Sequence, residues 1–204
     1  MAHGVVPESA ARAARQGMGP LARALRAAGI SANAITAVGV VLTVAGAALV
    51  ALEMPLAGLV ALIVGSLADT LDGLVARASG GGTKAGAFLD STADRIADAA
   101  LFAAAAWLGA THTDALLFWA ALVALSGSSL VSYVRAKAES LGVRATVGPA
   151  PREARLAILL LGLAAWALFA LGAAFTYAVL VVAILASITA LQRIAVVVRA
   201  LGRT

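Results

Sequence analysis

Five aspartates gather in one stretch of a chain that is otherwise poor in charge. Asp69 and Asp72 are separated by three positions, and Asp90, Asp94 and Asp98 follow one another at intervals of four. In helices, each set lies on one face. Carboxylates crowded into a small volume do not all stay ionised without cations, and hard oxygen ligands suit Mg²⁺, Mn²⁺ or Ca²⁺. The predicted metal ligands are Asp69, Asp72, Asp90 and Asp94, and the deeper Asp98 is expected to support them by hydrogen bonding.

Small residues accompany these carboxylates. Gly73 and Ala76 continue the face of the first pair, and Gly86 precedes Asp90 on the second. They leave room for a bulky ligand beside the metal, which favours phosphoryl chemistry because divalent ions neutralise a diphosphate. The alternative is structural: the aspartates cap helices or pair with neighbouring basic residues, namely Arg77, Lys84 and Arg95.

The composition points to lipid as the solvent. Of 204 residues, 62% are hydrophobic and 12% charged, whereas a soluble domain carries about 25% charged residues. The absence of cysteine excludes disulfides and thiolate metal sites, and two histidines are too few for a histidine metal site. The net charge of +5 marks the cytoplasmic side of a membrane protein better than it indicates nucleic acid, which we do not expect as a partner.

Six apolar runs have the length of membrane-spanning helices or come close to it. We therefore predict an all-α integral membrane protein with six transmembrane helices in residues 31–204. Residues 1–30 form a cytoplasmic juxtamembrane segment with an amphipathic interfacial helix, because Met18, Leu21 and Leu25 alternate with arginines; a partly disordered leader is the alternative. The runs are Ala34–Leu52, Pro55–Val75, Ala85–Leu108, Ala115–Val134, Leu156–Leu171 and Phe175–Val198.

The charges agree with one orientation of these helices. With the N-terminus inside, the leader, residues 76–84, residues 135–155 and the tail face the cytoplasm. Every Lys and Arg then falls in or beside these segments or toward the cytoplasmic end of a helix. The carboxylates lie toward the same side. The sequence thus predicts an active site at the cytoplasmic face of the membrane. The richness in Ala, Val and Arg fits a bacterium with a high-GC genome, so the expected membrane is a bacterial plasma membrane.

The aspartates belong to a longer pattern. The run Asp69-Thr70-Leu71-Asp72-Gly73-Leu74-Val75-Ala76-Arg77, followed after eight residues by Gly86-Ala87-Phe88-Leu89-Asp90-Ser91-Thr92-Ala93-Asp94, resembles the signature of the CDP-alcohol phosphotransferase family at every fixed position. A second stretch, residues 31–36, resembles the family's Pro-Asn-x-x-Thr element with Ala32 in place of the proline. Helix capping by Ser31 or Asn33 is the alternative there.

The resemblance implies roles for these residues. The four predicted ligands would hold two divalent ions, Mg²⁺ or Mn²⁺. Asp94 would also be the general base on an acceptor hydroxyl, which attacks CDP-diacylglycerol and releases CMP. The CDP-lipid site would comprise Asn33, Thr36, Gly73, Ala76, Arg77 and Gly86. The family also implies a homodimer in the lipid bilayer.

Basic residues bear on the acceptor alcohol. Guanidinium groups bind phosphate bidentately, so their abundance in residues 132–155 favours a phosphorylated alcohol; plain inside-positive topology is the alternative. Residues 88–95, 132–139 and 152–156 are similar to the actinobacterial branch of the family, which makes phosphatidylinositol phosphate from inositol phosphate, although Arg135 and Lys137 stand in reversed order. This resemblance places Ser132, Arg135, Arg155 and Arg193 at the acceptor phosphate.

Two other functions stay open from the sequence. Glycerol 3-phosphate would also use a basic pocket, and its product would be phosphatidylglycerol phosphate. In a cation transporter the aspartates would form an ion path, but transport sites usually lie near the bilayer midplane.

Overall fold

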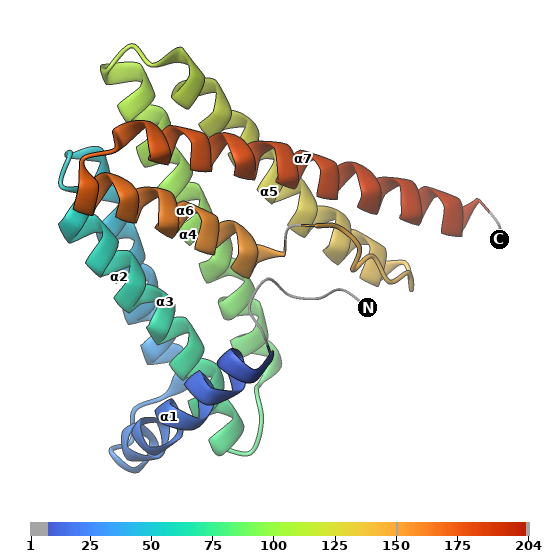
Figure 1. The fold of residues 1–204 in the computed structure, drawn as a ribbon. Helices are drawn as coiled ribbons and strands as arrows, with labels where there is room; N and C mark the ends of the chain where they lie inside the picture. Colours follow the sequence, from blue (N-terminus) through green and yellow to red (C-terminus); the bar gives the residue numbers. More distant parts are fainter. Residues whose placement is uncertain (1–7, 150, 203–204) are drawn as a thin grey trace. The chain divides into compact units, whose positions relative to one another are not determined.

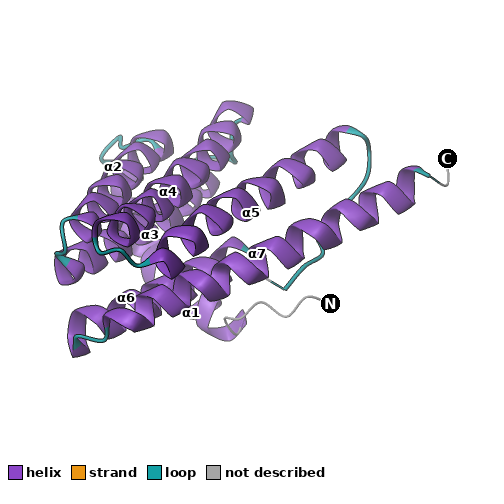
Figure 2. Ribbon diagram, turned by 90° about the horizontal axis from the view of Figure 1, so that it is seen from above, coloured by secondary structure: helices purple, strands orange, loops and turns teal. Residues whose placement is uncertain are grey.

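The computed structural model describes residues 8–149 and 151–202, which form helices and connections without a strand (Figure 2). This confirms the predicted all-helical class. Each of the six predicted apolar runs overlaps one helix from α2 to α7. The helices are α1 (Glu8–Ala27), α2 (Ala32–Ala51), α3 (Pro55–Ala78), α4 (Lys84–Thr111), α5 (Ala115–Ser140), α6 (Arg152–Phe169) and α7 (Gly172–Leu201) (Figure 1).

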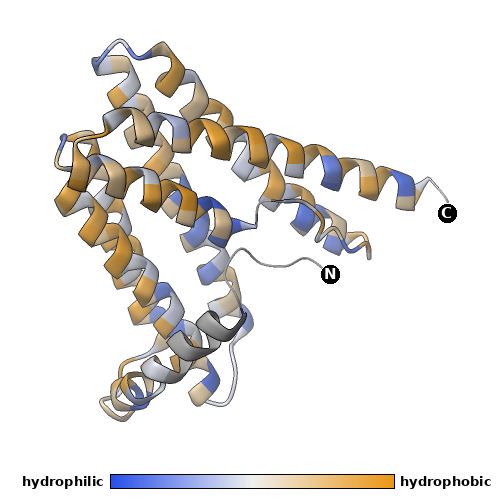
Figure 3. Ribbon diagram, in the orientation of Figure 1, coloured by the Kyte–Doolittle hydropathy of each residue, from blue (hydrophilic) through white to orange (hydrophobic). Residues whose placement is uncertain are grey.

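Four of the described helices, α2, α3, α5 and α7, are long and apolar enough to cross a membrane. Hydrophobic residues dominate α2, α3 and most of α7, and hydrophilic ones appear toward the C-terminal end of α7 (Figure 3). The other two helices expected to span, α4 and α6, are more charged: α6 carries Arg152, Glu153 and Arg155 within its 18 residues. The fold is therefore that of a membrane protein, and the count of six spans remains a prediction.

The chain divides into two compact units, which are described one at a time. The first contains α1, α2, α3 and α4 as far as Leu101. The second contains α4 from Phe102 onward together with α5, α6 and α7. All the predicted metal and CDP-lipid residues belong to the first unit, and the four predicted acceptor residues belong to the second.

Glycines let α2 and α3 approach closely in the first unit. A Cβ atom at Gly39 would lie 3.1 Å from the Ala68 Cβ and 3.3 Å from the Gly65 carbonyl oxygen. Such small residues replace bulky packing where two helices in lipid come together. Gly39 follows Thr36 by one turn, and Gly65 precedes Asp69 by one turn. The close contact of the two helices therefore fixes the position of Thr36 relative to Asp69.

Helix α1 lies across the end of α3 (Figure 1). Its Ala22 is buried in a cluster with Ile35, Ala68 and Val75. Arg26 donates a hydrogen bond from Nη1 to the carbonyl oxygen of Ala78, at the C-terminus of α3 where carbonyl groups lack helical partners. A helix is thus present where the interfacial helix was predicted, and its position on a membrane surface remains a prediction.

In the second unit, α7 packs against both α5 and α6. Gly127 of α5 allows this approach, since a Cβ there would lie 3.1 Å from the Ala186 Cβ. Asp114 caps α5 by accepting from the Leu117 amide at 3.0 Å, and it also accepts from the Thr176 hydroxyl at 3.1 Å. One carboxylate therefore ties the start of α5 to the start of α7.

Candidate functional site

Three carboxylates meet in the first unit. Asp69 and Asp72 of α3 and Asp90 of α4 each offer an oxygen atom, and these atoms lie within 4.8 Å of one another. Asp72 is buried, Asp69 is half-buried and Asp90 is exposed, so the group opens to one side. Three hard oxygen donors at such distances fit a divalent cation such as Mg²⁺ or Mn²⁺. The spacing argument thus brought together three of its four predicted metal ligands.

The connection between α3 and α4 creates this meeting. Gly80 and Gly81 adopt positive φ angles of 98° and 114°, a backbone conformation that glycine reaches at little cost. The hydroxyl of Thr83 then accepts a hydrogen bond from the Gly86 amide at 2.9 Å and so caps the first turn of α4. The chain reverses within a few residues and returns Asp90 to the side of Asp72.

Asp94 and Asp98 continue the same face of α4. The Oδ1 atom of Asp94 is buried, and Asp98 is half-buried. Among the described residues, the close carboxylate group comprises Asp69, Asp72 and Asp90. Asp94 follows Asp90 by one helical turn and is not part of this close group. Its roles as fourth ligand and as base remain predictions.

Asp72, the buried member of the predicted metal ligands, has a neighbour that the sequence did not suggest. Thr36 of α2 donates from Oγ1 to Asp72 Oδ2 at 2.5 Å, and the same oxygen lies 3.1 Å from the carbonyl oxygen of Ala32. A hydroxyl has one proton, and the shorter contact to a carboxylate is the stronger one. The predicted contact of Thr36 is with the CDP-lipid, whereas in this structure its hydroxyl orients a carboxylate.

The remaining predicted CDP-lipid residues lie on the same three helices as Thr36 and the carboxylates, α2, α3 and α4. Asn33 and Gly86 are neighbours, because a Cβ at Gly86 would lie 3.5 Å from Asn33 Oδ1. The guanidinium group of Arg77 folds back over Gly73, where a Cβ would lie 3.4 Å from Nη1. Ala76, which lies between Gly73 and Arg77 in the same helical turn, is half-buried. Small residues thus stand beside the aspartates along α3 and α4, with the Arg77 guanidinium group over Gly73.

Ser31 has the structural role that was held open for it. Its hydroxyl oxygen accepts from the Ala34 amide at 3.2 Å and caps α2. Asn33 is exposed in the first turn of α2. The capping interpretation is therefore right for Ser31, and Asn33 stays available to a ligand.

The predicted acceptor residues divide into buried and exposed members. Arg155 and Arg193 are only 3% and 8% exposed. Arg135 is exposed and forms an ion pair with Glu139 at 2.9 Å, and Ser132 is half-buried. Arg135, Arg155 and Glu139 are the charged neighbours of Arg193, so three cations and one carboxylate lie near one another here.

Ser128 is a buried polar residue that the sequence argument did not consider. It lies one turn before Ser132 on α5 and is buried, and its hydroxyl oxygen has no hydrogen-bond partner among the described residues. The spacing of four from Ser132 was the signal that could have found it.

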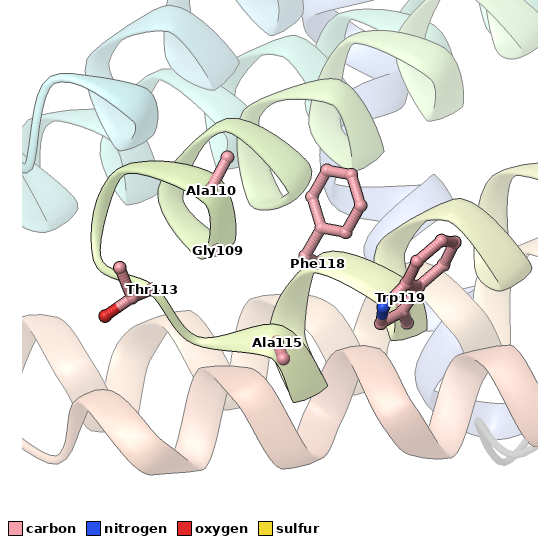
Figure 4. Close-up of a pocket in the computed structure, with 6 residues that line it drawn as sticks. All are labelled: Gly109, Ala110, Thr113, Ala115, Phe118 and Trp119. Atoms are coloured by element: carbon pink, nitrogen blue, oxygen red, sulfur yellow. The ribbon is translucent and has the colours of Figure 1, made fainter.

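A shallow cavity lies elsewhere, where the turn from α4 to α5 leaves a hollow (Figure 4). It is lined by Gly109, Ala110, Thr113, Ala115, Phe118 and Trp119. This lining contains no carboxylate, histidine or basic group, so it offers nothing for metal or phosphate chemistry. The exposed indole of Trp119 is typical of residues at a membrane–water interface.

The sequence pattern of the CDP-alcohol phosphatidyltransferase family matches residues 29–198. Phosphatidylinositol phosphate synthase of Mycolicibacterium smegmatis is 42% identical over 131 residues, which make up 63% of this chain. The match spans 59% of the length of that curated relative.

Solved structures agree with this similarity. Phosphatidylinositol phosphate synthase of Mycobacterium tuberculosis with CDP-DAG bound is 35% identical, with a TM-score of 0.82, over 88% of this chain and 92% of the solved chain. The structure of the same enzyme in complex with manganese and citrate matches with the same identity and TM-score and covers 88% of each chain.

Proposed function

The chain belongs to the CDP-alcohol phosphatidyltransferase family, and from this premise we propose that it transfers the phosphatidyl group of CDP-diacylglycerol to inositol phosphate. The products would be phosphatidylinositol phosphate and CMP. The observation that carries the proposal is the close carboxylate group of Asp69, Asp72 and Asp90, which stand at three fixed positions of the family signature. Membership in an enzyme family leaves the transporter interpretation without support.

The metal proposal rests on the donor set. The four aspartates would hold two divalent ions, Mg²⁺ or Mn²⁺, with Asp94 completing the site. The carboxylate oxygens suit such ions, and manganese is present in a solved relative. When bound, the ions would neutralise the diphosphate charge of the CDP-lipid.

Asp94 is proposed as the general base. Its carboxylate would accept the proton of the acceptor hydroxyl as the hydroxyl oxygen forms a bond to the phosphorus next to the diacylglycerol. The bond from this phosphorus to the bridging oxygen breaks, and CMP leaves with that oxygen and its electron pair. The proton later passes to solvent. Proton transfer by a positioned carboxylate contributes about 10²–10⁴-fold to rate.

The CDP-lipid would occupy the space beside the carboxylates. Gly73 and Ala76 leave room for the nucleotide, and Arg77 is proposed to bind its phosphates. Asn33 and Gly86, which are neighbours across α2 and α4, would line the other edge. Thr36 would act mainly by holding Asp72.

The acceptor phosphate is proposed to bind the cations of the second unit. Arg155 and Arg193 are buried, and with Arg135 nearby the cations outnumber the single carboxylate of Glu139, so an anion would be stabilised there. Ser132 and Arg135 would add a hydroxyl and a second guanidinium group. A neutral alcohol would not use this charge.

The membrane arrangement is proposed as a six-helix domain over residues 31–204. It would be preceded by an interfacial helix within residues 1–30, and the active site would face the cytoplasm at a bacterial plasma membrane. The support is the four apolar helices, the overlap of α4 and α6 with the predicted runs, and the charge asymmetry. A homodimer is proposed from the small-residue helix surfaces, which permit close packing.

CMP release by the purified protein tests this function. The assay would supply CDP-diacylglycerol and Mg²⁺ and compare inositol phosphate, free inositol and glycerol 3-phosphate. We expect release with inositol phosphate alone. Preference for glycerol 3-phosphate would keep the chemistry and change the acceptor, and no release with any acceptor from folded, metal-loaded protein would refute the proposal.

A further inference from the structure

The connection between α5 and α6 is fastened to its surroundings at several points. It begins after Leu141 with a C-terminal motif in which Gly142 has φ 73°, the Val143 amide donates to Ala138 O at 2.9 Å and the Gly142 amide to Glu139 O at 3.1 Å. Two residues further on, Ala145 is completely buried. Most of the described connection is exposed, as loops normally are, but the burial of Ala145 shows that one point of it is packed against the protein.

Arg193 of α7 contacts this connection. Its Nε donates to the carbonyl oxygen of Val147 at 3.0 Å, and its Nη1 donates to the carbonyl oxygen of Val131 at 2.9 Å. A single guanidinium group thereby bridges the connection and α5 from a position on α7. The hydrogen bond to Val131 is buried and the one to Val147 is partly buried. The Val147 oxygen lies outside the helices, so it has no partner from a helical ladder.

A second contact lies one turn away on the same helix. Gly148 has φ 123°, and a Cβ atom there would lie 2.9 Å from the Cβ of Thr189, which is fully buried. The connection thus reaches α7 at two successive turns, through the carbonyl of Val147 and the bare backbone of Gly148. Both contacts join groups of the protein itself.

We propose that Arg193 is a positioning residue that fastens the α5–α6 connection to α7 and so fixes where α6 begins. Pro151 starts that helix, and its carbonyl oxygen accepts from the Arg155 amide at 3.2 Å. Arg155 is therefore held a short distance along the chain from the anchored Val147. The proposal rests on the proposed function only where it makes Arg155 an acceptor residue.

We call the two hydrogen bonds from Arg193 to Val147 and Val131 the anchor. The Arg193 guanidinium group can form this anchor and bind an acceptor phosphate through different nitrogen atoms. The hydrogen bonds to Val147 and Val131 use Nε and Nη1, so an acceptor phosphate would be reached through Nη2. Loss of Arg193 should then loosen the connection even when no substrate is present. A residue that only bound phosphate would leave the empty protein unchanged.

Limited trypsin digestion of the full chain in lipid nanodiscs measures the anchor without substrate. Arg144 is exposed, but the following Ala145 is buried, so cleavage after Arg144 requires local opening of the connection. Cleavage of this kind follows the population of the open form. We expect Arg193→Met to raise the rate about tenfold or more, and Arg199→Met, which removes an exposed arginine from the same helix, to leave it unchanged.

Gly148→Ala tests the same attachment through the connection itself, because the added Cβ would collide with Thr189 while Arg193 stays in place. It should also accelerate cleavage after Arg144, and it should raise the KM for inositol phosphate while the KM for CDP-diacylglycerol stays the same. Wild-type cleavage rates in both variants would overturn the proposal, and a loosened connection with an unchanged acceptor KM would overturn the positioning of Arg155. If the wild-type protein released no CMP but the variants were cleaved faster, the proposed function would fail and the anchor would stand.

Discussion

Replacement of Thr36 by valine should weaken divalent-metal binding although Thr36 is not itself a predicted ligand. Valine keeps the shape of threonine and removes the hydroxyl that donates to Asp72 Oδ2 at 2.5 Å. Asp72 is 5% exposed, so water has little access to replace that donor. The carboxylate would lose the hydrogen bond that sets its orientation toward Asp69 and Asp90.

The size of the effect follows from the kind of hydrogen bond. A hydrogen bond to a charged group contributes about 1.5–3 kcal/mol, and loss of a partner that orients a metal ligand costs about 10–100-fold in affinity. At about 1.4 kcal/mol per tenfold, the two ranges agree. We therefore expect the Kd for Mn²⁺ to rise by about 10–100-fold in Thr36→Val.

Mn²⁺ titration of the purified protein, followed by calorimetry or by the paramagnetic resonance of the free ion, measures this Kd. Thr36→Ser retains a hydroxyl and should bind nearly as the wild type does. Thr43→Val is the matched control, because the Thr43 hydroxyl donates to the Gly39 carbonyl oxygen of its own helix at 2.9 Å. Equal Mn²⁺ affinity in Thr36→Val and the wild type would refute the reasoning.

Three further outcomes test the chemistry. Asp94→Asn should lower the rate of CMP release by about 10²–10⁴-fold while the protein keeps its thermal unfolding temperature, and retained turnover would remove Asp94 as the base. Arg155→Met should raise the KM for inositol phosphate by about 10–100-fold, the equivalent of a charge-assisted hydrogen bond, with an unchanged KM for CDP-diacylglycerol; equal effects on both would make Arg155 a purely structural residue. Treatment with EDTA should abolish CMP release and added Mn²⁺ should restore it, whereas full activity in EDTA would contradict a metal-dependent reaction.

Hydropathy predicted where the helices lie but not where they end. The apolar run at Ala115–Val134 continues in the structure as α5 to Ser140. The additional turns contain Arg-Ala-Lys-Ala-Glu. These residues have high helix propensity, but a prediction based on the length of apolar runs does not include them. The exposed pair Arg135–Glu139 lies in this extension at a helical spacing of four. Charge ends an apolar run but does not end a helix.

The site was predictable where its residues are periodic along one helix. Spacings of three and four brought Asp69, Asp72 and Asp90 together, because a short connection between two helices leaves little freedom. The hydrogen bond from Thr36 to Asp72 was not predictable in this way, since it joins residues on different helices and depends on the glycine contacts between α2 and α3. Contacts that depend on helix packing have no periodic trace in the sequence.

The helices that depart from the hydropathy of a membrane span are those that carry the proposed chemistry. The charged residues of α4 include Asp90, Asp94 and Asp98, and those of α6 include Arg152 and Arg155. Ionisable groups are costly in lipid and persist there chiefly where they have a function. If α4 and α6 span the bilayer, their charges must face protein or ligand rather than hydrocarbon, which is the arrangement that a transferase with a charged lipid donor and a phosphorylated acceptor requires. The shortfall from six apolar spans to four is thus a consequence expected of the proposed activity.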